Sequence, residues 1–298
     1  MLSCVIGIMA YNEEANVGEL LERLLAQKSR NVKIREIYVI ASGCTDRTVE
    51  ITAEYMKKSP LVNVVVQEKR EGKASAINFF LHEIKANFDD IIVLISADTL
   101  PDMDLIDNLI TPFRDGNIGM TSGHPVPIND LNTFIGYTVQ LVWKLHHQIA
   151  LVKPKMGEVI AFRNVFYRIP FDSAVDEANI EPLILGQGYI LKYIPEAVLK
   201  NKGPTTVKDY IKQRRRIYSG HVQVRKYQGY STSTMNPFFV LGKLAKIMDR
   251  RPKYVFWTIG AVLLEGYCRI LGKLDSFSKK KDHAVWDISE STKDLKKC

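Results

Sequence analysis

The pattern of apolar and polar residues alternates between short apolar runs and stretches with helical spacing. The runs Leu2–Met9, Ile37–Ile40, Val62–Val66 and Ile91–Ile95 are rich in β-branched residues and have the length of strands. Between them, apolar residues recur three and four positions apart, as in Val17–Leu25, which predicts helices. Strands and helices that alternate with short links predict an α/β fold with a mostly parallel sheet flanked by helices.

After residue 121 the pattern becomes less regular. Its prolines predict that Gly123–Pro127 is extended. We expect strands at Glu158–Tyr167 and Tyr189–Ile194, and helices at Leu131–Val152, Ala178–Leu185, Thr206–Tyr227, Phe238–Met248 and Tyr254–Leu271. The last helix is strongly apolar but contains Glu265 and Arg269, whereas a spanning helix needs about 20 predominantly apolar residues. We therefore interpret it as a buried or interfacial helix.

Composition and charge narrow the class of protein. The chain has 298 residues, of which 46% are hydrophobic and 25% charged, as in soluble globular proteins. From Thr205 onward the chain has 20 Lys and Arg residues and 8 Asp and Glu residues. Before Thr205 it has 21 Lys and Arg residues and 25 Asp and Glu residues. This basic final third indicates an anionic partner, such as a phosphate-rich ligand, a membrane surface or nucleic acid. The four cysteines lack metal-ligand spacing, and no secretory signal precedes the first strand, so we expect reduced thiols in a cytoplasmic protein.

Asp98 is the first candidate for chemistry. It follows the apolar run Ile91–Ile95, whose composition is that of a strand buried on both faces. Ligands of open α/β sheets bind outside the carboxyl ends of the strands, which is where this carboxylate would lie. Asp102 and Asp104 either support it or form the acidic start of the next helix.

Several motifs follow one another in a distinctive order on the expected elements. They are Tyr11–Glu14, Gly43–Thr48, Arg70–Lys73, Ala97–Asp98, Asp176–Glu177 and Gln213–Arg216. In this order they resemble the family 2 inverting glycosyltransferases, which have the GT-A fold, over roughly residues 1–227. The resemblance implies a nucleotide-sugar donor, a divalent metal (Mg²⁺ or Mn²⁺) and direct displacement at C1 of the sugar.

The resemblance also implies an arrangement of domains. It predicts a GT-A catalytic domain over residues 1–230, with a nucleotide-binding half at 1–120 and an acceptor half at 121–230. An apolar helical extension over 231–275 and a polar tail over 276–298 would follow.

Donor-binding residues are carried over from the motifs. Glu13 resembles the family's nucleotide-contacting acid and Lys73 its basic contact to the diphosphate, with Tyr11, Ser42 and Asp98 completing the donor set. A Lys beside a helix N-terminus can hold a diphosphate. Without the resemblance, Glu13 reads as an acid in the first turn of a helix and Lys73 as an exposed turn residue.

Catalytic residues follow from the later motifs. When the Gly188-Tyr189 turn is aligned, Glu177 falls on the family's catalytic base and Asp176 on the acid before it. The alternative is that both acids cap a helix. Gln213, Arg214 and Arg216 resemble the Gln-x-x-Arg-Trp motif of processive synthases and would contact the diphosphate or the acceptor, unless they form a solvated basic face. Ile217 replaces the Trp of that motif, which argues against a processive polymerase.

Two departures from the family pattern concern the donor site. The family often has two aspartates that recognise the nucleotide base of the donor, and this sequence has Ala41 and Ser42 at those positions. The identity of the donor nucleotide is therefore not predicted. Ser96 replaces the first Asp of the Asp-Ala-Asp motif, so only Asp98 remains for the metal.

His221 is either a further metal ligand or an ordinary buried histidine. His146 and His147 are adjacent on a helix and point to different sides, so we expect an acceptor-pocket or structural role and not one shared metal.

Apolar and basic residues gather in the C-terminal region. Tyr254–Trp257 and Ala261–Leu264 lie between Lys243–Lys253 and Lys279–Lys281, which predicts peripheral contact with the inner face of a membrane. The expected partners are therefore a nucleotide-sugar donor and a lipid-linked or saccharide acceptor, with no nucleic acid. Two alternatives stay open: a nucleotidyltransferase with a related core, and a non-catalytic protein that binds anionic surfaces.

Overall fold

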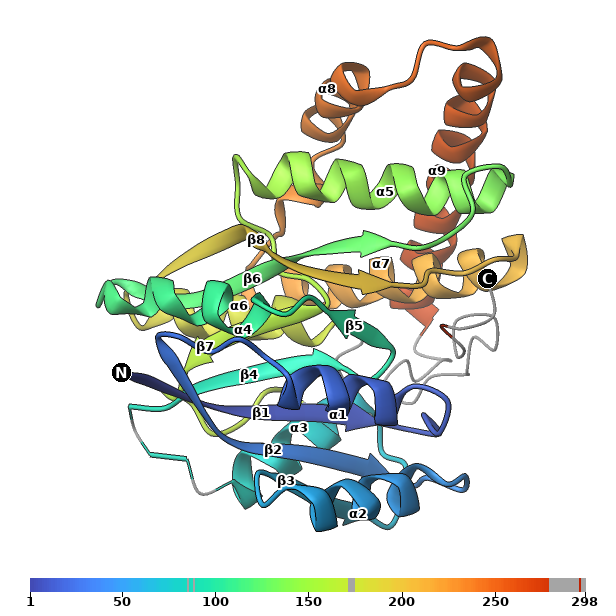
Figure 1. Cartoon of the computed structure of the whole chain (residues 1–298). Coiled ribbons are helices and arrows are strands. Elements are labelled where there is room, and N and C mark those ends of the chain that lie inside the picture. Colours follow the sequence, from blue (N-terminus) through green and yellow to red (C-terminus); the bar gives the residue numbers. More distant parts are fainter. Residues whose placement is uncertain (85, 88, 171–174, 279–294, 296–298) are drawn as a thin grey trace.

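One mixed sheet forms the centre of the molecule (Figure 1). The computed structural model describes residues 1–84, 86–87, 89–170, 175–278 and 295. The strands are β1 (Leu2–Ala10), β2 (Val32–Ser42), β3 (Val62–Gln67), β4 (Ile91–Ser96), β5 (Thr99–Pro101), β6 (Ile118–Pro127), β7 (Val159–Arg163) and β8 (Ile190–Asn201). They lie in the order β3-β2-β1-β4-β7-β6-β8-β5.

The sheet is mostly parallel, as the sequence predicts. Strands β3, β2, β1 and β4 are parallel neighbours, and so are β6 and β8. The exceptions are β7, which is antiparallel to both β4 and β6, and the short β5, which is antiparallel to β8. The sheet runs through both predicted halves of the catalytic domain, and the division at residue 120 stays a prediction.

Helices cover both faces of the sheet. They are α1 (Val17–Leu25), α2 (Thr48–Lys58), α3 (Lys73–Glu83), α4 (Leu105–Ile110), α5 (Phe134–Ala150), α6 (Asp176–Gly186), α7 (Val207–Gln228), α8 (Pro237–Ile247) and α9 (Pro252–Ser278), with 3₁₀ turns η1 (Thr111–Arg114) and η2 (Ser233–Met235). Buried residues of α1, α2 and α4 share one core with the sheet, whereas those of α3 and α6 pack on its other face.

The two cores follow from the alternation of side chains along β1. Ile6 and Ile8 face the core under α1, whereas Val5 belongs to the core under α3. Gly7 faces the α3 side, where a Cβ atom would lie 2.6 Å from the ring of Phe80. The missing side chain therefore lets the fully buried Phe80 of α3 pack directly on the strand.

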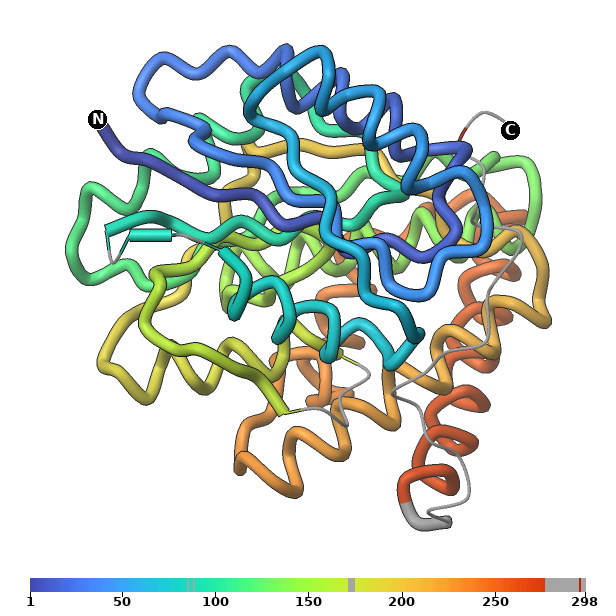
Figure 2. The backbone as a smooth tube through the Cα atoms, turned by 90° about the horizontal axis from the view of Figure 1, so that it is seen from below, coloured from blue at the N-terminus to red at the C-terminus, as the bar shows by residue number. Residues whose placement is uncertain are grey.

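The C-terminal helices form a layer at the end of the sheet that is far from β3 (Figure 1). α9 packs along α7, and Figure 2 shows the two helices side by side. Cys268 of α9 is buried against Val139 of α5 and Tyr210 of α7, and Ala261 shares a second small core with Leu244 of α8. The helices α8 and α9 are thus docked on α5 and α7.

α9 is longer than the sequence suggests and is exposed along one side. By length and composition alone, residues 252–276 could cross a membrane, but one such helix is weak evidence, and 22% of the tested window is buried. The exposed large apolar side chains of α9 form a stripe, which consists of Phe256, Ile259, Val262, Leu263, Tyr267, Ile270 and Leu274. The opposite side carries Thr258 and Asp275, both buried. One face of the helix is therefore docked and the other is not covered by the described chain.

Candidate active site

A cavity of about 220 Å³ lies beyond the carboxyl end of β4. It is bordered by the starts of α3 and α6, the residues before β7, and one face each of α5 and α7. Its polar lining consists of Lys73, Ser96, Asp98, His146, Lys155, Glu158, Asp176, Glu177, Asn201, Lys202, Tyr210, Gln213, Arg214, Arg216 and His221. Most of the predicted site residues therefore meet in one place, although they are up to about 150 positions apart in the chain.

Asp98 has a neighbouring acid that the motifs do not contain. Ile95 of β4 pairs with Val159 of β7, so the next residues, Ser96 and Glu158, lie opposite each other where the two strands leave the sheet. The Ser96 hydroxyl donates to Glu158 Oε2 at 3.4 Å. Burial, with repulsion from Asp98 next, raises the pKa of Glu158 to about 7. The structure thus keeps a pair of acids here, although the first Asp of the family motif is absent.

Lys73 opens α3 and points into the cavity. Its Nζ lies 3.2 Å from Oδ2 of Asp176, the first residue of α6. Burial acts to lower the pKa of Lys73, but the attraction of Asp176, Glu177 and Glu158 outweighs it and holds the pKa above its ordinary value. Lys73 is therefore a fixed positive charge in the cavity. Asp176 is 3% exposed, and its other oxygen, Oδ1, has no hydrogen-bond partner within the described chain.

The two acids of α6 do not act as caps. The N-cap position is Val175, which makes no side-chain capping bond, so neither acid occupies the capping position. Asp176 and Glu177 instead occupy the first turn, where the helix dipole favours carboxylates, and both line the cavity. The capping alternative is therefore wrong, while the catalytic roles of the two acids stay predictions.

The side chains of the arginine motif point to different sides of α7. Arg214, Arg216 and Gln213 line the cavity, whereas Arg215 is turned away and pairs with Asp275 of α9. Burial lowers the pKa of Arg216 to about 10, against the attraction of Asp176 and other acids, so its guanidinium is still charged near neutral pH. The motif is not a solvated basic face.

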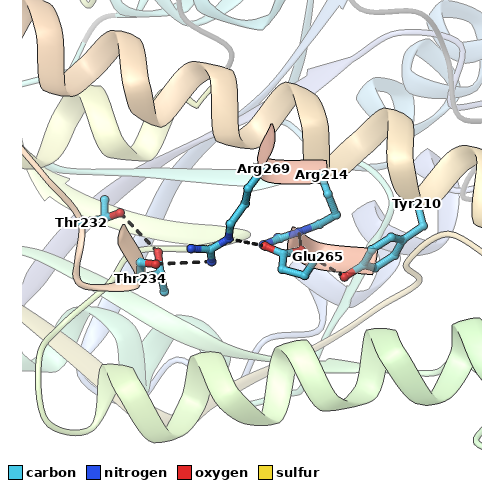
Figure 3. Close-up of polar contacts among 6 residues, drawn as sticks. All are labelled: Tyr210, Arg214, Thr232, Thr234, Glu265 and Arg269. Atoms are coloured by element: carbon cyan, nitrogen blue, oxygen red, sulfur yellow. Dashed lines mark hydrogen bonds and ion pairs between the residues drawn. The ribbon is translucent and has the colours of Figure 1, made fainter. Parts of the chain in front are cut away.

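Arg214 is held by the C-terminal helix (Figure 3). Its Nε and Nη2 donate to the two carboxylate oxygens of Glu265 at 2.9 and 2.8 Å. Arg269 adds a bond of 3.1 Å to the same carboxylate, and the hydroxyl of Tyr210 donates to it at 3.3 Å. Burial acts to raise the pKa of Glu265, but the two arginines hold it at about 2. The sequence showed Glu265 only as a charge that interrupts an apolar helix.

Three predicted donor residues lie elsewhere. The ring of Tyr11 is 3.9 Å from the guanidinium of Arg70, and the Ser42 hydroxyl donates to the side chain of Gln67 at 2.7 Å. Glu13 is 6% exposed and accepts a hydrogen bond of 2.9 Å from Asn16. These residues follow or end β1 and β2 at the same edge of the sheet as Asp98, but they do not line the cavity. Their contact with a nucleotide stays a prediction.

The two adjacent histidines of α5 point to different sides, as expected. His147 stacks on His124, with ring centroids 4.0 Å apart, and bonds the hydroxyl of Tyr193 at 2.9 Å. His146 lines the cavity together with Trp143 and is 6% exposed. Of the two, only His146 lines the cavity, and its role in an acceptor pocket stays a prediction.

Comparison with known proteins places this chain in a family. Residues 5–176 match the family model described as Glycosyl transferase family 2. The poly-β-1,6-N-acetyl-D-glucosamine synthase of Staphylococcus aureus (strain COL) is 26% identical over 244 residues, which are 78% of this chain and 57% of the relative. The N-acetylglucosaminyltransferase of Bradyrhizobium diazoefficiens is 19% identical over 70% of this chain and 47% of its own. The chain thus spans about half the length of these relatives.

Solved structures support the fold. The mannosyltransferase PcManGT of Pyrobaculum calidifontis, in complex with GDP-Man and Mn²⁺, has a TM-score of 0.65 at 20% identity and covers 93% of this chain and 88% of its own. The glucosyl-3-phosphoglycerate synthase of Mycobacterium tuberculosis, in complex with Mn²⁺, UDP and glucosyl-3-phosphoglycerate, has a TM-score of 0.51 at 17% identity. The match covers 78% of this chain and 82% of the synthase. At these identities the likeness shows the fold alone, and it confirms the expected GT-A type. Because the family model matches more than half of its residues, this chain belongs to glycosyl transferase family 2.

Proposed function

We propose that the cavity transfers a sugar from a nucleotide-sugar donor to an acceptor hydroxyl with inversion at C1. The observation that carries the proposal is that Asp98, Glu177, Lys73 and Arg216, from four separate segments, line one cavity at the carboxyl end of β4. Family membership supports glycosyl transfer over the nucleotidyltransferase alternative. GDP-Man and UDP in the solved neighbours support a nucleotide-sugar donor.

The charged groups suit the steps of such a reaction. Lys73, Arg214 and Arg216 place positive charge where a diphosphate would bind and depart, which stabilises the leaving group. Glu177 is in the same cavity and would take the proton from the acceptor hydroxyl as that hydroxyl attacks C1. Asp176, which is held by Lys73, would fix the start of α6 and therefore the position of Glu177.

A divalent metal fits the acidic side of the cavity. Asp98 and Glu158 offer the oxygen ligands that Mg²⁺ and Mn²⁺ prefer. Among the described residues, no three His, Cys, Asp or Glu side chains are arranged to hold an ion, so phosphate oxygens and water would complete the coordination. Bound there, the metal would neutralise the charge of the diphosphate. His221 as a ligand stays a prediction, although its charged neighbours are Lys155, Arg214 and Arg269, which favour an anion.

A thermal-shift screen of nucleoside diphosphates and nucleotide sugars, with and without Mn²⁺ or Mg²⁺, tests the donor site. A ligand at 100 times its Kd should stabilise the chain by about 2.7 kcal/mol. Asp98→Ala should abolish the metal-dependent part of the shift, whereas Asp104→Ala, which changes an exposed acid nearby, should retain it. Equal nucleotide affinity with and without metal in wild type and Asp98→Ala would contradict the metal site.

We infer that the chain works at the inner face of a membrane, on a lipid-linked acceptor. The uncovered apolar stripe of α9 and the exposed basic residues Lys246, Arg250, Arg251 and Lys253 support this. Lys279–Lys281, which entered the prediction, lie outside the described residues. Each basic side chain near an anionic leaflet contributes about 1 kcal/mol, and salt weakens that attraction.

Flotation with anionic and neutral liposomes, at low and high salt, tests the membrane contact. We expect the chain to float with anionic vesicles at low salt, and Leu263→Gln with Ile270→Gln to reduce the floating fraction. Equal recovery in the soluble fraction under every condition would leave a soluble saccharide as the acceptor.

A further inference from the structure

A second cavity of about 110 Å³ adjoins the first one. It is enclosed by α5, α7, η2, α8 and α9, and shares His146, Lys155, Arg214 and His221 with the first cavity. Its lining consists of Val142, Leu145, His146, Ile149, Lys155, Arg214, Ile217, Tyr218, His221, Thr234, Met235, Val240, Glu265 and Arg269. Because one water needs about 10–15 Å³, the space can hold a small polar group.

The charge of this lining is positive. The residues that line it include three cationic side chains, Lys155, Arg214 and Arg269, and one carboxylate, Glu265. This carboxylate already accepts hydrogen bonds from both arginines. Lys155 is partly buried, and within the described ranges its ammonium donates one hydrogen bond, of 3.5 Å, to the carbonyl of Met156. It makes no ion pair with any described residue. Burial lowers its pKa, and two acids of α6, Glu177 and Glu181, offset this only in part.

Two buried imidazoles add unpaired polar atoms. His146 and His221 are 6% and 7% exposed, and within the described chain neither Nε2 of His146 nor Nδ1 of His221 has a hydrogen-bond partner. Buried polar atoms without partners are rare in folded proteins and call for an explanation such as a missing ligand. Burial, and then the nearby Lys155, lower the pKa of both rings well below its ordinary value, so both are neutral. A neutral imidazole can donate one N–H to a bound oxygen.

We propose that the second cavity is the phosphate-binding subsite of a phosphorylated acceptor. Lys155 and Arg269 would supply charge, and His146 and His221 would each donate an N–H. This assignment rests on the proposed glycosyl transfer and names the class of acceptor. The subsite differs from that of the donor diphosphate, because Lys73 and Arg216 line the first cavity only and Arg269 lines the second only. Arg214 lies between the two cavities and is already paired with Glu265.

The position of the subsite suits an acceptor. Lys155 and His221 lie at the junction of the two cavities, so a phosphate ester bound there would direct its remaining atoms toward the cavity that holds Glu177. The apolar lining by Val142, Leu145 and Val240 would contact the carbon skeleton of the ester. The phosphate belongs either to a lipid head group or to a water-soluble phosphorylated compound, and the shared chemistry is a phosphate ester.

Calorimetric titration of the full chain with inorganic phosphate tests the subsite. The donor site is first saturated with the nucleoside diphosphate and metal that give the largest thermal shift. We expect phosphate to bind equally well with and without the nucleotide. Displacement of phosphate by the nucleotide would show that the probe occupies the donor diphosphate site, and it would overturn the proposal, as would no binding at all. If phosphate binds while no nucleotide does, the proposed glycosyl transfer fails and the anion site stands.

Variants of Lys155 separate binding from structure. Lys155→Met should weaken phosphate binding about tenfold or more, because a charge-assisted contact is lost. It should also raise the Tm of the ligand-free chain, since a partly buried charge without a partner is removed. Lys155→Arg should keep phosphate affinity within a few-fold. Lys57→Gln, which changes an exposed side chain of α2, should change neither the phosphate affinity nor the Tm. A lower Tm with unchanged phosphate affinity in Lys155→Met would make the lysine structural and overturn its role.

His221 provides a second, independent variant. His221→Leu should weaken phosphate binding and leave the metal-dependent nucleotide shift intact. The reverse pattern would place His221 at the metal and remove it from the subsite.

Decyl phosphate and glycerol 3-phosphate distinguish the two sources of the ester. Tighter binding of the alkyl phosphate indicates a lipid acceptor, and equal or weaker binding indicates a soluble one. Failure of both esters to bind would refute a phosphorylated acceptor.

Discussion

Replacing Glu265 by Gln tests how firmly α9 holds the arginine motif of α7. The Glu265 carboxylate accepts two hydrogen bonds from Arg214, one from Arg269 and one from Tyr210, and its side chain is 21% exposed. Its pKa is lowered from the ordinary 4.5 to about 2. At about 1.4 kcal/mol per tenfold change in proton affinity, this corresponds to about 3 kcal/mol of stability. Breaking a buried ion pair typically costs a similar amount, about 3–5 kcal/mol.

The pH dependence of this contribution has a definite sign. Because the pKa of Glu265 is lower in the folded chain than in the unfolded chain, the stabilisation is complete above about pH 4.5. It is lost as the pH falls toward 2. The difference in free energy of unfolding between wild type and Glu265→Gln should therefore shrink across this range.

Urea denaturation measures the effect at pH 7 and at pH 3. A double-mutant cycle of Glu265→Gln with Arg214→Gln isolates the coupling between the two side chains. The control is Glu19→Gln, which removes a partly exposed surface pair with Arg23 on α1 and should cost at most about 0.5 kcal/mol. A coupling energy between Glu265 and Arg214 that is no larger than the control would refute the reasoning.

Two further predictions concern stability. Gly7→Ala should destabilise the chain by about 1–3 kcal/mol, because its Cβ would lie 2.6 Å from Phe80, whereas Gly116→Ala, with no atom within 4 Å, should be nearly neutral in Tm measurements. Burial, the main cause, raises the pKa of Glu181 to about 7. The folded chain therefore binds more protons than the unfolded chain between about pH 4.5 and 7, and its stability falls as pH rises through that range. Glu181→Gln should make this fall smaller, and Glu158, whose pKa is also raised to about 7, should account for part of what is left. A variant with the same Tm profile as wild type would contradict it.

The fold was largely predictable because local patterns determine most of its elements. The helical spacing of Val17–Leu25 gives the bounds of α1, and the β-branched run at Val62 gives β3. The extent of β2 was wrong: it begins at Val32 and not at Ile37, because its charged first residues pair with β1 although they lack an apolar run. The three-residue strand β5 has no local signal, since only its pairing with the distant β8 makes it a strand.

The site was predictable where motifs cover it. Asp98, Glu177 and Arg216 were found from residues that lie next to each other in the chain. Glu158 was missed because only the antiparallel register of β4 and β7 brings it beside Asp98, and no motif includes it. Glu265 reaches Arg214 only because α9 docks on α7, which is a tertiary contact that no periodicity shows.

The central claim is that Glu177 is the base of a glycosyl transfer in the first cavity. The most direct measurement compares donor binding and turnover in wild type, in Glu177→Gln and in Asp176→Asn, which changes the competing candidate for the base, using the donor found by the thermal-shift screen. The account predicts unchanged donor binding in Glu177→Gln and a turnover lower by about 10²–10⁴, because the size of the side chain is kept and its basicity is lost. Normal turnover in Glu177→Gln would contradict the account.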